Sequence, residues 1–139
     1  MDDVLIRWEN DRWLRWLILF IGIHSCFLGF VMLFVPRFVI GILGFSTSVP
    51  LFFPSQCGVF LLILGFCYLR ALVEPSFIWT ILVSKTFAVG FLLVHVVFLS
   101  APPITWAAAA GDAGMLGATL FLLHRHKTQS EGAHTSHRM

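Results

Sequence analysis

The sequence predicts an all-α membrane protein, built as an antiparallel bundle of four transmembrane helices with the N- and C-termini both in the cytoplasm. Of its 139 residues, 58% are hydrophobic and only 12% are charged, whereas a soluble domain carries about 25% charged residues. The hydrophobic residues also gather into four separate stretches, each close to the roughly 20 residues that cross about 30 Å of hydrocarbon. Composition and spacing together make the lipid bilayer the first expected partner of the chain.

Three regions are expected along the chain. The segment 1–15 is expected to be cytoplasmic or interfacial, 16–124 to form the transmembrane domain, and 125–139 to be a polar cytoplasmic tail that is disordered from residue 128 onward. The four spans are predicted at about 16–35, 51–70, 77–99 and 104–124. The first span follows a start of mixed charge and precedes no A-x-A site, so we expect it to be retained rather than cleaved.

Prolines mark the joins between the spans. Pro36 follows the first span, while Pro54, Pro75 and Pro103 stand where later helices are expected to begin, a position at which the missing N–H costs nothing. The longest join, 37–53, contains a stretch that is too apolar for a free loop and too short to span. We expect this stretch to lie at the outer interface or to re-enter the membrane slightly.

Lysines and arginines assign the orientation, because those in short flanks remain on the cytoplasmic side of a membrane. Apart from Lys85, one side of the predicted topology carries only Arg37, and the other carries Arg7, Arg12, Arg15, Arg70, Arg125, Lys127 and Arg138. This asymmetry predicts that both termini lie in the cytoplasm. The expected location of this multi-pass protein is the plasma membrane, which is the inner membrane in bacteria. Trp8, Trp13 and Trp16 near the first span suit an aromatic belt at the membrane interface.

Small residues recur at helical spacing and predict where the helices approach one another. Lipid tails provide no hydrophobic incentive for two helices to associate, so close contact depends on residues that let the backbones meet. The expected packing positions are Gly22, Gly29, Gly58, Gly65, Gly111 and Gly114. A phosphate-binding G-x-G-x-x-G loop is excluded, because the glycines of the fourth span lie inside an apolar helix and follow no strand.

Two charged residues, Lys85 and Asp112, stand inside the third and fourth spans. Insertion of such a residue near midspan costs about 2.5 to 3.5 kcal/mol, so a compensating partner is expected. Counted from the cytoplasmic ends of the spans, Lys85 lies about 12 Å deep and Asp112 about 17 Å deep. A lysine stem covers that difference, and we therefore expect an ion pair, or a neutral hydrogen-bonded pair, between the two helices.

Other polar residues are expected to support this pair: Ser84, Thr86, Thr119, Tyr68 and Arg70. Two interpretations of the pair stay open at this stage. It could be structural and join two helices, or it could form a proton or anion site, since ionisable residues inside a membrane often mark pathways.

Cofactor, metal and enzyme chemistry are not expected. His24 and His95 could in principle be axial haem ligands, but they lie about 12 Å and 27 Å from the cytoplasmic side, too far apart in depth for one haem. His134 and His137 could bind a metal, although a solvated tail is the simpler interpretation. No catalytic triad or H-E-x-x-H motif can be assembled, and a net charge of +2 with scattered basic residues excludes nucleic acid as a partner.

The second half of the chain carries a spaced pattern, G-x6-G-x2-Y-x2-A-x3-P, followed by a lysine ten residues on and an aspartate in the last span. Its residues are Gln56, Gly58, Gly65, Tyr68, Ala71, Pro75, Trp79, Lys85 and Asp112. This pattern resembles small bacterial four-helix integral membrane proteins of the DoxX-like kind. The resemblance implies a single four-helix bundle and a role beside other membrane or redox components, because such proteins are thought to accompany oxidoreductases; it supplies no catalytic residues.

Two functions are consistent with these features. The first is an accessory or scaffolding subunit that packs against a larger membrane complex, possibly a redox complex, and has no chemistry of its own. The expected protein partners are other membrane subunits or, in a homo-oligomer, further copies of the chain. The second is a small oligomeric transporter, or a module that binds quinone or another ligand, in which Lys85 and Asp112 are the working residues.

Overall fold

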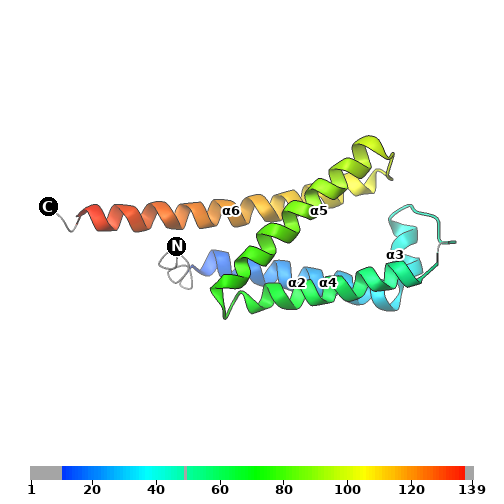
Figure 1. Cartoon of the computed structure of the whole chain (residues 1–139), viewed down its shortest axis with the longest axis horizontal. Coiled ribbons are helices and arrows are strands. Elements are labelled where there is room, and N and C mark those ends of the chain that lie inside the picture. Colours follow the sequence, from blue (N-terminus) through cyan, green and yellow to red (C-terminus); the bar gives the residue numbers. More distant parts are fainter. Residues whose placement is uncertain (1–10, 49, 137–139) are drawn as a thin grey trace.

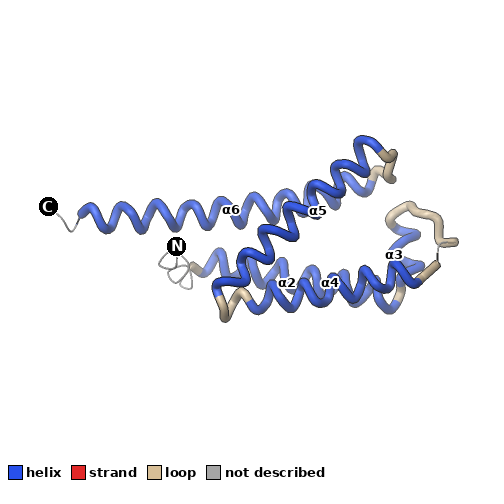
Figure 2. Tube along the Cα trace, viewed as in Figure 1, coloured by secondary structure: helices blue, strands red, loops and turns tan. Residues whose placement is uncertain are grey.

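The computed structural model describes residues 11–48 and 50–136, with side chains as far as residue 125. Five α-helices and one short 3-10 helix make up this part of the chain, which contains no strand (Figure 2). The elements are α2 (Arg12–Phe34), α3 (Pro36–Ile42), α4 (Phe52–Arg70), η2 (Pro75–Phe77), α5 (Ile78–Phe98) and α6 (Ile104–Ser136). The prediction of an all-α chain is confirmed.

Among the described residues, four segments are long and apolar enough to cross a membrane: Arg12–Phe34, Phe52–Arg70, Pro75–Phe98 and Ile104–Arg125. Each overlaps one of the four spans expected from the sequence. A multi-pass membrane protein is therefore indicated by length and composition together.

The first span begins earlier than expected, at Arg12 instead of residue 16. The cause is local, because the carboxylate of Asp11 accepts hydrogen bonds from the backbone N–H groups of Trp13, at 2.8 Å, and Leu14, at 3.4 Å. An aspartate at this position satisfies N–H groups that have no partner within the helix, so the helix begins directly after it. The expectations for residues 1–10 lie outside the described residues.

The last helix continues past the apolar span as far as Ser136. The expected disorder from residue 128 onward is therefore wrong for residues 128–136, which are helical. Residues 137–139 lie outside the described part of the chain. No proline follows Pro103 in the sequence, and a helix that is already formed adds each further residue at little cost. Polarity alone does not end a helix.

The join between the first two spans contains α3, a helix of seven residues. Pro36 is its first residue, where its fixed φ suits a helix start. Gly44 follows with φ +77°, a conformation that is open to glycine and strained for most other residues. The apolar part of this join is therefore a short helix and a turn.

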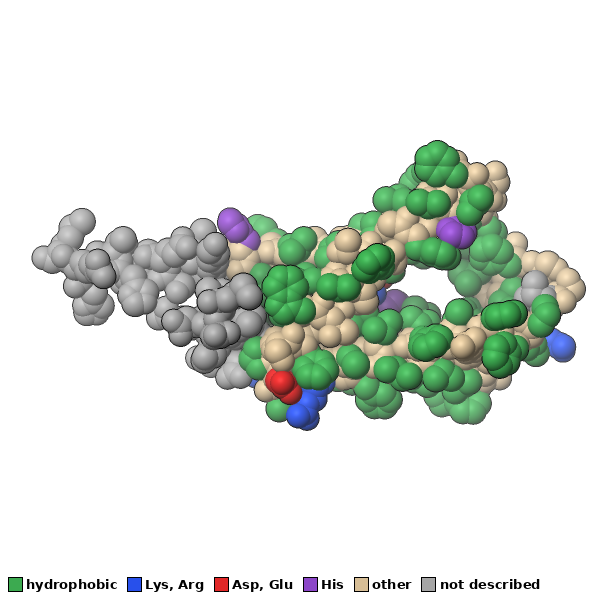
Figure 3. All heavy atoms as spheres, in the orientation of Figure 1, with side chains coloured by type: hydrophobic (Ala, Val, Ile, Leu, Met, Phe, Trp, Pro, Cys, Tyr) green, Lys and Arg blue, Asp and Glu red, His purple; other side chains and the backbone are tan. Residues whose placement is uncertain are grey.

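The long helices form two pairs, which we call the first hairpin (α2 and α4) and the second hairpin (α5 and α6). In Figure 1, α2 and α4 lie side by side along their lengths, with α3 at the turn between them. The two hairpins meet at the end of the molecule where α2 begins and α4 ends, and they diverge toward the other end (Figure 1). Figure 3 shows the opening between them in the space-filling view.

The hydrophobic core lies where the two hairpins meet. Its fully buried side chains come from α2, α4, α5 and the turn after α4: Leu14, Ile18, Ile21, Tyr68, Ala71, Ile78 and Ile81. Met115, Leu122 and Leu123 of α6 pack against this cluster. The core thus joins all four long helices at one end only.

Candidate functional site: an ion pair between α5 and α6

Lys85 and Asp112 form an ion pair between the two helices of the second hairpin. The ammonium nitrogen Nζ of Lys85 lies 2.5 Å from the carboxylate oxygen Oδ1 of Asp112. Only 8% of the Lys85 side chain and 20% of the Asp112 side chain are exposed. The structure therefore brings together the two residues that the sequence singled out by depth.

The helical period explains why Lys85 points inward. Ile78, Ile81 and Lys85 are the buried residues of α5, and residues three or four apart share one face of a helix. On α6, Asp112 lies three residues after the buried Ala109 and seven before the buried Thr119. Each charged residue thus stands on the face that its helix presents to the protein, and the charges offset each other within an apolar surrounding.

Tyr68 and Ser84 connect the first hairpin to this site. The hydroxyl oxygens of the two residues are 2.6 Å apart, and Ser84 also donates to the carbonyl oxygen of Thr80 at 2.5 Å. A serine hydroxyl has one hydrogen to donate, so Tyr68 is the donor in its bond with Ser84. The ring of Tyr68 lies 6.0 Å from Nζ of Lys85, at the outer limit of a cation–π contact.

The remaining polar residues expected around the pair occupy three different settings. Thr119 is fully buried and donates to the carbonyl oxygen of Met115, while Thr86 is exposed and donates to that of Leu82. Arg70 lies 3.8 Å from Glu74, and their side chains are 59% and 50% exposed. Arg70 therefore belongs to the surface of the chain and not to the surroundings of Lys85.

His24 and His95 each contact an aromatic residue of their own helix. His24 stacks on Phe20 with ring centroids 5.9 Å apart. His95 lies 3.9 Å from the ring of Phe91, and its Nδ1 bonds to the carbonyl oxygen of Phe91 at 2.8 Å, so Nδ1 carries the proton. Within the part of the chain that the structure describes, no three His, Cys, Asp or Glu side chains gather as a group that could hold a metal ion.

The glycines of the first hairpin lie at the contact between α2 and α4. A Cβ atom added to Gly58 would stand 2.6 Å from the backbone nitrogen of Leu33, and one added to Gly29 would stand 2.7 Å from that of Leu62. Gly22 and Gly65 face the opposite helix in the same way, near Leu69 and Cys26. These four glycines allow the two backbones to touch, as expected of small residues in membrane helices.

The glycines of the second hairpin are placed differently. An added Cβ would meet no atom within 4 Å at Gly111 or Gly114, nor at Gly90 and Gly117. The packing expected at Gly111 and Gly114 is therefore not seen within the chain. The reason is rotational, because α6 turns the face of Asp112 and Thr119 toward α5, and its glycines lie on other faces.

The sequence interpretation missed a cluster at the end of the molecule where α2 begins. Arg12, Arg15 and Trp16 line a pocket there, and Arg125 lines a second pocket together with Trp13 and Trp16. The sequence signal is a set of arginines and tryptophans at the ends of two spans, and that signal alone predicts the orientation of the chain and not a cluster. Proximity of the two span ends could not be read from their positions in the chain.

Comparison with known proteins adds no relative to this description. No protein-family model matches the chain, and no curated protein and no solved structure matches it either.

Proposed function

We propose that the chain is an accessory subunit of a larger membrane assembly, with no catalysis of its own. In this proposal its four spans form an antiparallel bundle in the plasma membrane, the inner membrane of a bacterium, with both termini in the cytoplasm. The excess of basic residues on one side supports that orientation. The resemblance to DoxX-like proteins supports a position beside membrane or redox components.

The observation that carries the proposal is the open face of α6 around Gly111, Gly114 and Gly117. Each of these glycines is exposed, and a Cβ added to any of them would meet no side chain and no other helix within 4 Å. Glycine weakens a helix by about 0.5–1 kcal/mol relative to alanine. Three glycines on an exposed surface therefore destabilise α6, and no close contact inside the chain compensates for this loss. Close packing against a helix of another subunit would compensate for this loss of helix stability.

The first hairpin illustrates what such a contact looks like. There, Gly29 and Gly58 face each other so closely that each would place a Cβ within 2.8 Å of the other's carbonyl oxygen. Small residues promote helix association in lipid by this approach of backbones. The α6 face offers the same surface to a helix of another subunit.

Substitution of Gly114 tests the proposal. Gly114 is exposed and a Cβ added there meets no atom within 4 Å, so the Gly114→Leu variant is expected to fold. A loss of about 1.4 kcal/mol in the contact would reduce the partner recovered from mildly solubilised membranes about tenfold. Gly114→Ala, with one added methyl group, is expected to lose less. Recovery of a monodisperse oligomer without any other protein, from the wild type, would contradict the subunit role.

A second function is supported by the ion pair itself. Lys85 donates one of its three ammonium hydrogens to Asp112, and the second carboxylate oxygen of Asp112 accepts no bond from any described residue. We therefore keep a small oligomeric transporter or ligand-binding module as the alternative, with Lys85 and Asp112 handling a proton, a quinone or an anion.

Reconstituted vesicles distinguish the two functions. If the alternative holds, wild-type protein should carry protons or small anions across vesicle membranes, and Lys85→Met combined with Asp112→Leu should abolish the flux while leaving the fold intact. If the subunit role holds, the wild type and this double variant should both be silent in the flux assay.

A further inference from the structure

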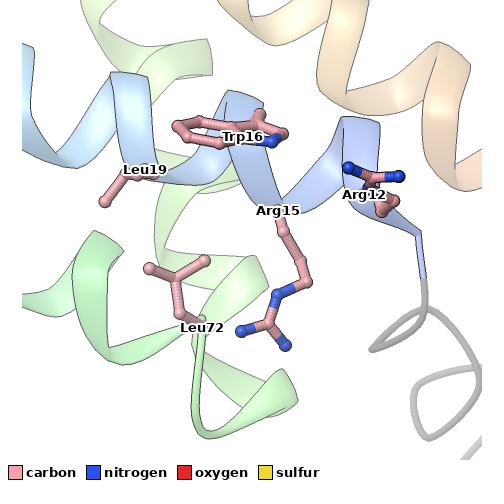
Figure 4. Close-up of a pocket in the computed structure, with 5 residues that line it drawn as sticks. All are labelled: Arg12, Arg15, Trp16, Leu19 and Leu72. Atoms are coloured by element: carbon pink, nitrogen blue, oxygen red, sulfur yellow. The ribbon is translucent and has the colours of Figure 1, made fainter.

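A groove that is open to the surface of the chain lies between α2 and α6. This α2–α6 groove has a volume of about 440 Å³, and it is lined by Trp13, Trp16, Leu17 and Phe20 of α2 and by Ala118, Leu122 and Arg125 of α6. Its three aromatic side chains are 72%, 65% and 59% exposed. Figure 4 shows Arg15 leaving α2 on a different side from Trp16, in the direction of Leu72, so the α2 wall of the groove is aromatic and apolar.

The helical period continues both walls of this groove toward the middle of the membrane. On α6, Arg125, Leu122 and Ala118 follow one another at intervals of three or four residues, and the next position in that series is Gly114. On α2, Phe20 is followed four residues later by His24, whose ring stacks on that of Phe20 with centroids 5.9 Å apart. The open face of α6 is therefore one wall of the groove, and the face of His24 is the other.

His24 and Gly114 lie at nearly the same depth. At about 1.5 Å per residue, His24 is about 18 Å along α2 from Arg12, and Gly114 is about 17 Å along α6 from Arg125, which are the residues that end the two candidate spans. Since the hydrocarbon core is about 30 Å thick, both positions stand near its middle. Neither water nor lipid headgroups are present at this depth to form hydrogen bonds with a side chain.

His24 lacks a hydrogen bond that His95 possesses. Each ring lies against the phenylalanine four residues before it, but Nδ1 of His95 also bonds to the carbonyl oxygen of Phe91 at 2.8 Å. No residue that the structure describes forms a hydrogen bond with either ring nitrogen of His24. Because a polar group without a hydrogen bond is unfavourable in an apolar surrounding, the His24 ring favours a partner from outside the chain.

The hydrogen-bonding capacity of the ring indicates which side chain that partner would carry. A neutral imidazole has one donor and one acceptor nitrogen, and an amide group likewise both donates and accepts. A hydroxyl does the same, but in membrane helices it is readily taken up by its own backbone, as the hydroxyls of Thr86 and Thr119 are here. An amide is therefore the better match for His24.

We propose, on the basis of the subunit role given above, that the partner helix lies in the α2–α6 groove and places an asparagine or glutamine side chain beside His24. Gly114 and Ala118 allow the close approach of the partner backbone on one side, and Trp13, Trp16 and Phe20 cover it on the other. Hydrogen bonds of this kind form between helices in lipid. The amide then selects this partner among apolar helices of similar shape.

Two synthetic transmembrane peptides test the recognition with the full-length protein in lipid vesicles. Both consist of leucine and alanine, and they differ only in carrying asparagine or leucine at midspan; binding is measured by energy transfer from labelled protein, at dilutions at which each peptide is monomeric. The wild type should bind the asparagine peptide about 3-fold to 16-fold more tightly than the leucine peptide. His24→Phe keeps a ring beside Phe20 and should remove this preference, whereas His24→Gln should retain part of it.

His95→Phe is the matched control, because Nδ1 of His95 is already bonded within α5, and it should leave the preference unchanged. Gly114→Leu should weaken the binding of both peptides by a similar factor. Equal binding of the two peptides by the wild type, or a preference that persists in His24→Phe, would overturn the role of His24, while a loss in Gly114→Leu would still support the subunit role. Unchanged binding in Gly114→Leu would contradict the subunit role instead, and failure of both peptides to bind the wild type would contradict both.

Discussion

The two helices of the first hairpin are joined in a different way from the two helices of the second. In the first, α2 and α4 touch through backbone at Gly29 and Gly58, where even one added carbon would come within 2.7 Å of the other helix. In the second, α5 and α6 are joined by the charged pair of Lys85 and Asp112, and their glycines are exposed. The comparison shows that glycine in a membrane helix is not by itself a sign of packing within the chain.

The two kinds of contact predict different responses to substitution. The contact of the first hairpin is distributed over four glycines along the helices, so each position carries a share of it. In the second hairpin, the polar contact between described side chains of α5 and α6 is the single pair of Lys85 and Asp112. An ammonium and a carboxylate without each other are strongly unfavourable in an apolar setting. A single substitution should therefore destabilise the fold more at the ion pair than at a glycine of the first hairpin. The losses from the two substitutions at the ion pair should not add.

The largest effect is expected at the ion pair. Lys85→Met leaves Asp112 buried without its partner and should destabilise the fold by about 3–5 kcal/mol, measured by unfolding in mixed micelles of mild detergent and dodecyl sulfate. Lys85→Met with Asp112→Leu removes both charges and should recover most of that loss. A loss in the double variant equal to the sum of the losses in Lys85→Met and in Asp112→Leu would show that the two residues are not coupled.

A smaller loss is expected at the glycines of the first hairpin. Gly58→Ala forces a Cβ against the backbone of Leu33, and overpacking of this kind costs about 1–3 kcal/mol. Gly114→Ala is the matched control, because its Cβ meets nothing within 4 Å and alanine favours the helix by about 0.5–1 kcal/mol. Thermal unfolding in detergent should thus move in opposite directions for the two variants; a shift of the same sign and size would erase the distinction between the hairpins.

The smallest effect is expected where the hairpins are connected. Tyr68→Phe keeps the ring beside Lys85 and removes only the hydroxyl that donates to Ser84. Hydrogen bonds between membrane helices are worth about 0.6 kcal/mol on average and at most about 1.7 kcal/mol, so the same unfolding assay should register a loss in that range. Thr86→Val, which affects a bond within α5 only, should have no comparable effect on the contact between the hairpins.

Much of the fold could be predicted from the sequence, because span length, hydropathy and proline position are local properties. The pairing of Lys85 with Asp112 could also be anticipated, since the cost of burying each charge demands a partner at a similar depth. Contacts that depend on how each helix is rotated about its own axis could not be predicted. The sequence spacing of Gly111 and Gly114 is as regular as that of Gly22 and Gly29, and nothing in it states which face of α6 turns toward α5.

The ends of the helices were harder to predict than their centres for a related reason. Asp11 starts α2 earlier than hydropathy suggested, and α6 continues into a polar stretch because nothing in that stretch stops it. Hydropathy reports where a helix can lie in lipid, whereas capping and propagation decide where it begins and ends. The arginine and tryptophan pockets lie at these ends, which is why they emerged only from the structure.

The central claim, that the open face of α6 receives another membrane helix, is tested most directly by photo-crosslinking in native membranes. Phe121 lies seven residues beyond Gly114 on the same face and is 66% exposed, and Phe66 of α4 is a matched position with 67% exposure. Benzoylphenylalanine at position 121 should give one discrete protein adduct that disappears in the Gly114→Leu background, and at position 66 it should give none. Adducts of equal yield from both positions, or an adduct at position 121 that persists with Gly114→Leu, would contradict the account.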